Sequence, residues 1–207
     1  MSNTNNSESL VDTPSKSFAW MSIIYGLIGW AAAFALTLER IHVSANPNAT
    51  LSCDLNVFIS CKSVMLTKQA ALLGFPNPLI GLAAFVAPIF VGFAVLAGAR
   101  LKQWFWRIYM VGISMGFIFV LFLFSQSTYV IHVLCPYCML AWIAMIPLFW
   151  KTLLWAGAEG VIDVPVRLVP TFIKGQDYVW LYTIGTEFLA ALAIVISFWS
   201  SWPSMFR

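Results

Sequence analysis

The sequence predicts an all-α integral membrane protein, and two observations lead to this fold class. Of the 207 residues, 61% are hydrophobic and only 9% are charged, whereas a soluble domain is about 45–50% apolar and about 25% charged. The apolar segments are also continuous and lack the period-two alternation of membrane strands. Because only helices and closed barrels satisfy their backbone hydrogen bonds in lipid, these segments favour helices and exclude a soluble globular protein.

Five apolar segments are long enough to cross a hydrocarbon core of about 30 Å. We expect helices at about 18–38, 79–99 and 104–124, a fourth within 129–155, and a fifth at about 178–202. The polar segment 1–17 lacks the basic start of a signal peptide and is expected to be a disordered cytoplasmic tail. Residues 156–207 are expected to form a cytoplasmic loop and the fifth transmembrane helix.

The distribution of Lys and Arg predicts the orientation, because these residues accumulate in cytoplasmic loops. With the N-terminus inside, seven of the 11 basic residues lie inside and four outside. This orientation places the 39–78 loop, the 125–132 connection and the C-terminus outside. The inside set is Lys16, Arg100, Lys102, Arg107, Lys151, Arg167 and Lys174, and the outside set is Arg40, Lys62, Lys68 and Arg207.

The 39–78 loop is expected to be structured. The segments 46–48 (Asn-Pro-Asn) and 75–78 (Phe-Pro-Asn-Pro) break regular structure within it. Between them, the residues 61–73 are helix-forming and carry apolar side chains at helical spacing. This pattern predicts one short interfacial helix.

The four cysteines are the conspicuous chemical feature. Cys53 and Cys61 lie in the loop, and Cys135 and Cys138 form a Cys-Pro-Tyr-Cys sequence that opens the fourth helix. Proline is tolerated in the first turn of a helix, so Pro136 predicts a helix start close to Cys135. The positive end of a helix lowers a thiol pKa, and disulfides persist in extracytoplasmic compartments.

Four interpretations of these cysteines are open: a structural zinc site, two permanent disulfides, buried unreactive thiols, or a redox relay. The spacing across a membrane boundary is unlike that of zinc ribbons or fingers, and no metal is predicted. Cys138 lies about one turn inside an apolar helix, where no covalent staple is needed. We favour a relay, because thiol–disulfide exchange moves two electrons at a time between cysteine pairs.

These residues resemble the vitamin K epoxide reductase family, specifically its bacterial homologues that oxidise DsbA-like proteins and reduce quinone. The matching elements are Cys53-Asp54 and Cys61 with Ser63 and Thr67, the segment 77–81 (Asn-Pro-Leu-Ile-Gly), and Cys135-Pro136-Tyr137-Cys138. The resemblance covers about residues 18–155. It implies a four-helix bundle around a quinone pocket, to which the fifth helix is an addition.

The resemblance also implies a role for each cysteine. Cys138 corresponds to the thiolate that contacts the quinone, with Cys135 as its disulfide partner. Cys61 corresponds to the loop cysteine that exchanges with Cys135, and Cys53 to the outermost one, which meets the partner protein. The implied activity is a membrane thiol-disulfide oxidoreductase of the bacterial inner membrane that reoxidises a DsbA-like partner and reduces menaquinone or ubiquinone.

Two further positions are candidates for quinone binding. Asn77 matches the family's donor to a quinone carbonyl, and its alternative role is a helix cap before the second span. Trp142 stands where eukaryotic members have a tyrosine, and its indole can donate a hydrogen bond but cannot accept one.

Two competing functions remain: a quinone-epoxide reductase that uses the same thiols, and a non-enzymatic scaffold with static disulfides. Many bacterial homologues carry a fused thioredoxin-like domain, whereas only about 50 residues follow the fourth span here. We therefore expect the partner to be a separate protein.

Two ionisable residues outside this set are also candidates. Glu187 lies within the fifth span and is expected to be protonated or hydrogen-bonded to a neutral group. It either mediates packing against the bundle or carries protons. His132 either relays protons to the cysteines or is an interfacial histidine without chemistry.

Overall fold

A computed structural model describes residues 11–47, 50–54, 56 and 58–199. Within these residues the secondary structure is helical, apart from two isolated β-bridges. Five helical segments of the described chain are long and apolar enough to span a membrane, which confirms the predicted fold class. They are Lys16–Ala45, Asn77–Leu96, Gln103–Ile131, Pro136–Ala158 and Val169–Phe198. Residues 1–10 of the expected tail and residues 200–202 of the expected fifth helix lie outside the described residues.

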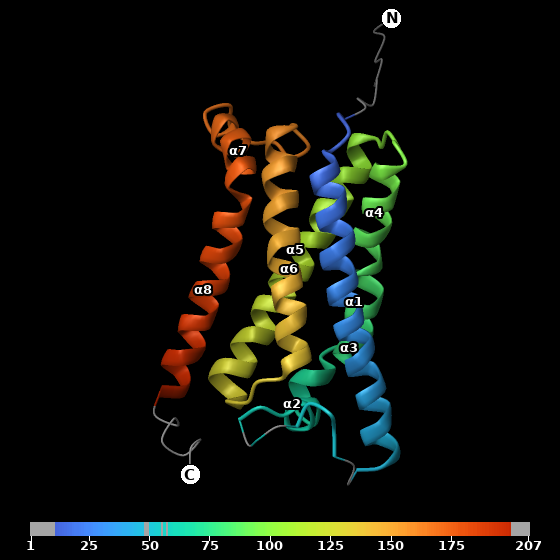
Figure 1. Cartoon of the computed structure of the whole chain (residues 1–207), viewed down its shortest axis with the longest axis vertical. Helices are drawn as coiled ribbons and strands as arrows, with labels where there is room; N and C mark the ends of the chain where they lie inside the picture. The colour runs from blue at the N-terminus through green and yellow to red at the C-terminus, as the bar shows by residue number, and fades with distance from the viewer. Residues whose placement is uncertain (1–10, 48–49, 55, 57, 200–207) are drawn as a thin grey trace, which may run out of the picture.

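The centre of the molecule is a bundle built on α1 (Lys16–Ala45) and α6 (Pro136–Ala158). The second span, α3 (Asn77–Ala84) followed by α4 (Val86–Leu96), packs along α1, and α5 (Gln103–Ser125) packs against α6 (Figure 1). Small residues permit close approach of membrane helices. At Gly92 of α4, an added Cβ would lie 2.7 Å from the backbone oxygen of Ala19 in α1.

The fifth span is peripheral to this bundle. It comprises α7 (Val169–Gly175), the 3-10 turn η3 (Gln176–Tyr178) and α8 (Val179–Phe198). Figure 1 shows α8 beside α6 and away from α1 and α4. Two hydrogen bonds attach α8: the Trp150 indole donates to Thr186 at 3.0 Å, and the Ser197 hydroxyl donates to the Thr128 carbonyl at 2.8 Å.

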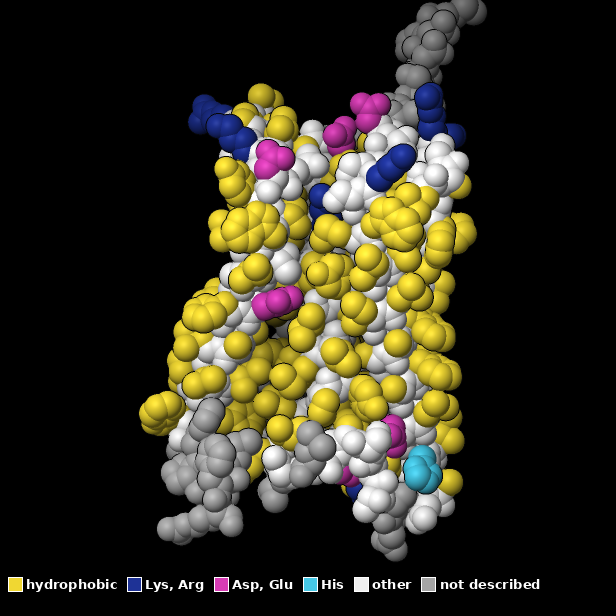
Figure 2. Space-filling view, in the orientation of Figure 1, with side chains coloured by type: hydrophobic (Ala, Val, Ile, Leu, Met, Phe, Trp, Pro, Cys, Tyr) yellow, Lys and Arg dark blue, Asp and Glu magenta, His cyan; other side chains and the backbone are white. Residues whose placement is uncertain are grey.

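The surface has the polarity of a multi-pass membrane protein. Figure 2 shows hydrophobic side chains over the length of the helices, with Lys and Arg concentrated at the end that carries the N-terminus. The cysteine-bearing loop and α2 lie at the opposite end (Figure 1). An apolar band between two polar ends fits a lipid bilayer.

Three local predictions were wrong. The 61–73 segment forms two turns, α2 (Cys61–Met65) and η1 (Lys68–Ala71), because Thr67 between them has an extended backbone (φ −78°, ψ 155°). The 125–132 connection is mostly helical: α5 continues into a π-helical turn, η2 (Gln126–Ile131), whose Ser127 hydroxyl bonds the Val133 carbonyl. Of the expected tail, residues 16 and 17 instead begin α1, whose N-cap is Ser15, and Val11 packs against the core.

The close α1–α4 contact predicts the effect of adding one methyl group. Gly92→Ala should lower the free energy of unfolding by about 1–3 kcal/mol, since the new Cβ meets helix backbone. Gly112→Ala is the matched control, because a Cβ there meets nothing within 4 Å and alanine stabilises a helix interior by roughly 0.5–1 kcal/mol. Thermal unfolding in detergent measures both. Equal melting temperatures for the two variants would contradict the contact.

Candidate functional site

A short backbone pairing brings the two cysteine-bearing segments together. Ile59 and Leu134 form an isolated parallel β-bridge. The Ser60 N–H donates to the Leu134 carbonyl at 3.0 Å, and the Leu134 N–H donates to the Phe58 carbonyl at 2.8 Å. Because Cys61 and Cys135 directly follow the paired segments, the bridge places them side by side.

The loop pair forms a disulfide. Cys53 and Cys61 are bonded, with their Cα atoms 5.7 Å apart. Cys61 is the first residue of α2, whose N-cap Ser60 accepts a hydrogen bond from the Ser63 N–H at 3.1 Å. Cys53 is only 5% exposed and Cys61 is fully buried. The disulfide is therefore shielded from solvent in this structure.

Asp54 organises the loop around the disulfide. Its Oδ1 accepts the Ser60 hydroxyl at 2.8 Å and the Lys62 N–H at 3.1 Å, and its Oδ2 accepts the Leu51 N–H at 3.4 Å. Burial acts to raise the pKa of Asp54, but these hydrogen bonds and the nearby Lys62 charge hold it below its ordinary value. The carboxylate is therefore ionised at neutral pH and fixes the turn that carries Cys53.

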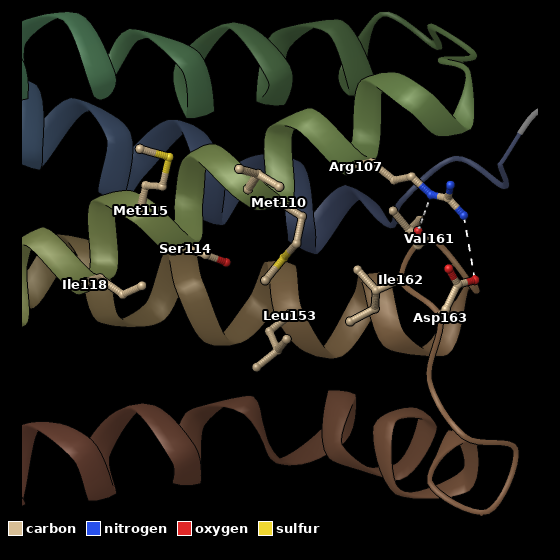
Figure 3. A pocket seen from close by; sticks show the side chains of 10 residues that line it. Arg107, Met110, Ser114, Met115, Ile118, Leu153, Val161, Ile162 and Asp163 are labelled. Atoms are coloured by element: carbon tan, nitrogen blue, oxygen red, sulfur yellow. Dashed lines mark hydrogen bonds and ion pairs between the residues drawn. The ribbon is translucent and has the colours of Figure 1, made fainter.

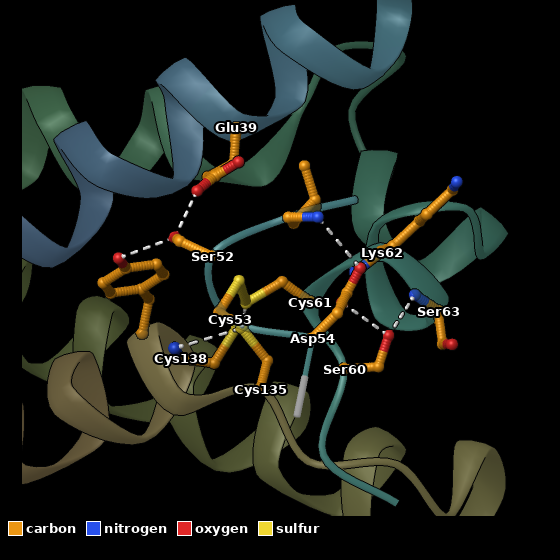
Figure 4. Close-up of a disulfide and its surroundings, with 12 residues drawn as sticks. Glu39, Ser52, Cys53, Asp54, Ser60, Cys61, Lys62, Ser63, Cys135 and Cys138 are labelled. Carbon is orange, nitrogen blue, oxygen red and sulfur yellow. Dashed lines mark hydrogen bonds between the residues drawn. A yellow bond between two sulfur atoms is a disulfide. The ribbon is translucent and has the colours of Figure 1, made fainter. Parts of the chain in front are cut away.

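The second pair is reduced and touches the first. Cys135 and Cys138 are free thiols, and the Cys135 Sγ lies 3.4 Å from the Cys61 Sγ (Figure 4). Cys135 is the N-cap of α6, as the position of Pro136 predicted, and its sulfur accepts the Cys138 N–H at 3.4 Å. The hydrogen bond with the Cys138 side chain lowers the pKa of Cys135, burial opposes this, and the Cys138 and Tyr137 N–H groups lower it further.

Side-chain hydrogen bonds connect the disulfide-bearing loop to α1 and α6. The Ser52 hydroxyl donates to the Glu39 carboxylate at 2.5 Å and lies 3.3 Å from the Tyr137 hydroxyl (Figure 4). Tyr137 lies between the two cysteines of α6, so this contact links the loop to the second pair. Sequence analysis named Asp54 and Tyr137 only as motif positions without a role, and it missed Ser52 and Glu39. The position of Ser52 beside Cys53 was an available signal, whereas nothing local in the sequence pointed to Glu39.

Asn77 and Trp142 occupy different surroundings. The buried Asn77 amide donates to the Gln69 carbonyl at 2.7 Å and accepts the Leu72 N–H at 3.1 Å, so it ties α3 to the loop. Trp142 lies one helical turn after Cys138, and its ring packs on Phe124 with centroids 5.1 Å apart. Cys138 and Trp142 share one apolar cluster.

Glu187 and His132 are separate from the cysteines. Glu187 is half-buried on α8, and it has no hydrogen bond or ion pair within the described part of the chain. His132 is exposed, adopts a left-handed backbone (φ 55°) after η2, and has its ring 6.1 Å from that of Phe198. Neither residue is placed at the sulfurs.

A disulfide in contact with a second dithiol, at one end of a membrane helix bundle, defines a membrane thiol-disulfide oxidoreductase. Residues 20–153 match the family described as the vitamin K epoxide reductase family. The chain belongs to this family. The match covers α1 to most of α6 and leaves α7 and α8 outside it. No individually curated protein sequence matches the chain.

The lowered pKa of Cys135 predicts a pH effect. Its thiolate should form at lower pH than that of an ordinary cysteine, and Cys138→Ala should move the titration to higher pH by removing the largest stabilising contact. Thiolate absorbance against pH, with the Cys53–Cys61 disulfide intact, measures this. Cys138→Ser keeps a hydroxyl donor and should shift the midpoint less. An unchanged midpoint in the alanine variant would exclude this contact as the cause.

The hydrogen bonds of Asp54 predict a stability effect. Asp54→Ala should cost about 0.5–2 kcal/mol at neutral pH, as expected for the loss of a capping carboxylate. Because the pKa is lowered in the fold, the ionised group stabilises it at neutral pH, and this contribution is lost as the pH falls through the folded pKa. Unfolding measured against pH should show wild type and Asp54→Asn converging in acid. A pH-independent gap would argue against an ionic contribution.

Proposed function

We propose that this protein reoxidises a DsbA-like partner and passes the two electrons to a quinone, supporting disulfide formation outside the cytoplasm. The observation that carries the proposal is the 3.4 Å separation of the Cys61 and Cys135 sulfurs, which belong to two different pairs. Sulfurs in contact exchange without large movement. A scaffold with static disulfides has no need of a free dithiol in contact with a disulfide.

The first step is reduction of the loop disulfide by the partner. A partner thiolate attacks Cys53, forms a mixed disulfide and releases Cys61. The partner's second thiol then displaces Cys53, so that the partner leaves oxidised and both loop cysteines are reduced. Cys53 is 5% exposed, so the partner engages after the Ser52 contacts with Glu39 and Tyr137 open.

The second step moves the electrons to the α6 pair. Cys61 attacks an oxidised Cys135–Cys138 disulfide at Cys135 and releases Cys138. Cys53 then attacks Cys61, which restores the Cys53–Cys61 disulfide and leaves Cys135 and Cys138 as thiols. The described state, with a loop disulfide and a free α6 pair, corresponds to the end of this step.

The final step reduces the quinone, which accepts two electrons and two protons and leaves as hydroquinone. Cys135 and Cys138 supply the electrons and close to a disulfide. Cys138 is the most exposed of the four cysteines, since the other three are at most 5% exposed, and it adjoins the apolar cluster of Trp142. Asn77 uses one of its two amide N–H donors on Gln69, so the other is left to orient a quinone carbonyl.

The proposed location is the bacterial inner membrane, with the N-terminus inside and the cysteines outside. The excess of basic residues at the end opposite the cysteines supports this orientation. An extracytoplasmic site also suits a partner whose disulfides must persist.

Replacing Cys138 tests the proposal directly. Cys138→Ser should abolish quinone reduction, because the α6 disulfide cannot close. Quinone absorbance, followed in membranes with a reduced DsbA-like protein or a small dithiol as donor, measures the rate. Leu140→Met, at an exposed position two residues further along α6, is the control and should retain activity. Quinone reduction by Cys138→Ser would refute the electron path.

Replacing Cys53 separates the two electron donors. Cys53→Ser should reduce turnover with the protein partner by at least about tenfold and retain reduction by a small dithiol, which reaches the inner sulfurs directly. Comparing the two donors in one assay measures this. Equal loss with both would contradict the assignment of Cys53 as the partner's target.

A further inference from the structure

A groove of about 570 Å³ lies between α5 and α6 (Figure 3), and the loop after α6 that lines it is at the end of the molecule opposite the cysteine-bearing loop (Figure 1). The loop that follows α6 closes one end of it through Val161, Ile162 and Asp163. From Ile118, the lining residue of α5 nearest the cysteine end, the helix rises about 20 Å further to Ile131 at 1.5 Å per residue. A molecule in this groove is therefore too far from the sulfurs to take part in the thiol relay.

The lining is apolar along most of the groove and charged at one end. Its hydrophobic side chains extend over more than two turns of α5 and onto α6, and Val111, Met115 and Ile118 are well exposed. Such a surface accepts a hydrocarbon chain. The apolar lining comprises Met110, Val111, Met115, Ile118, Leu153 and Ile162.

The charged end holds one cation and one anion. The Arg107 Nε donates to the Val161 carbonyl at 2.9 Å, and its Nη2 lies 3.7 Å from the Asp163 Oδ1. The Arg107 side chain is 50% exposed and that of Asp163 is 96% exposed. A guanidinium has five N–H donors, so most of those on Arg107 remain available. Arg107 is also four residues from the start of its span, the depth at which arginine reaches lipid head groups.

We propose that this groove binds phosphatidylethanolamine, a phospholipid whose head group carries both a phosphate and a primary ammonium. The phosphate lies at Arg107, the ammonium at Asp163, and one acyl chain follows the apolar lining. Ser114 lines the groove two turns deeper than Arg107 and has no hydrogen-bond partner within the described residues.

The charge pattern selects this head group over other common phospholipids. Phosphatidylglycerol has a phosphate but no cation, so Asp163 would be left beside a net negative head group. Phosphatidylcholine has a cation without N–H donors, so it cannot hydrogen-bond the carboxylate. The site is independent of the proposed electron path, because none of its lining residues contacts the cysteines.

Native mass spectrometry of the full chain in detergent tests the proposal. The wild type should retain phosphatidylethanolamine about fivefold more strongly than phosphatidylcholine of the same acyl chains, the upper range for one exposed ion pair. Asp163→Asn should abolish this preference without a loss of stability, because Asp163 is almost fully exposed. Arg107→Gln should weaken binding of both lipids.

The matched controls are Asp177→Asn and Arg167→Gln, exposed charges at the same end that do not line the groove. Both should retain the wild-type preference. Equal binding of the two lipids by the wild type, an unchanged preference in Asp163→Asn, or tighter binding of phosphatidylglycerol would each overturn the proposal. If Arg107→Gln fails to fold through loss of its bond to Val161, the Asp163→Asn comparison still decides.

Discussion

The functional geometry depends on a small backbone pairing between the loop and the start of α6. Two hydrogen bonds join Phe58 and Ser60 to Leu134, and each segment leads directly into a cysteine. An unpaired backbone group beside an apolar bundle costs free energy, so the pairing both satisfies these groups and fixes the position of the loop. The contact between Cys61 and Cys135 follows from it.

Around this pairing, charges and hydroxyls add to an apolar cluster in which Leu51 and Met65 of the loop pack with Leu36 of α1. The Asp54 carboxylate accepts three hydrogen bonds around the turn that carries Cys53. Ser52 connects Glu39 at the end of α1 to Tyr137 at the start of α6. The Ser52 bonds are exposed and the one to Tyr137 is individually weak, whereas the Asp54 bonds are partly buried and made to an ionised carboxylate, so the Ser52 contacts are the ones that open most readily.

The helices position the site by a different kind of interaction. Between lipid-exposed helices, association depends on close packing and interhelical hydrogen bonds. Close packing joins α1 to α4 at Gly92, whereas α8 is attached to α6 and η2 by the side chains of Thr186 and Ser197. The family match ends before α8, and most of the α8 surface faces outward. The four cysteines therefore lie within the family-matched part of the chain, whereas Phe198 of α8 packs in the apolar cluster that holds Cys138 and Trp142.

The sequence by itself determined the membrane class, the five spans and the start of α6 at Cys135, because hydropathy and the position of Pro136 are local properties. It did not determine that 61–73 divides at Thr67, that α5 continues through η2, or that Ser52 and Tyr137 meet. These features depend on contacts between residues far apart in the chain, such as Ile59 with Leu134. Tertiary structure decided which sulfurs touch, since the same four cysteines are compatible with several pairings until the loop is placed.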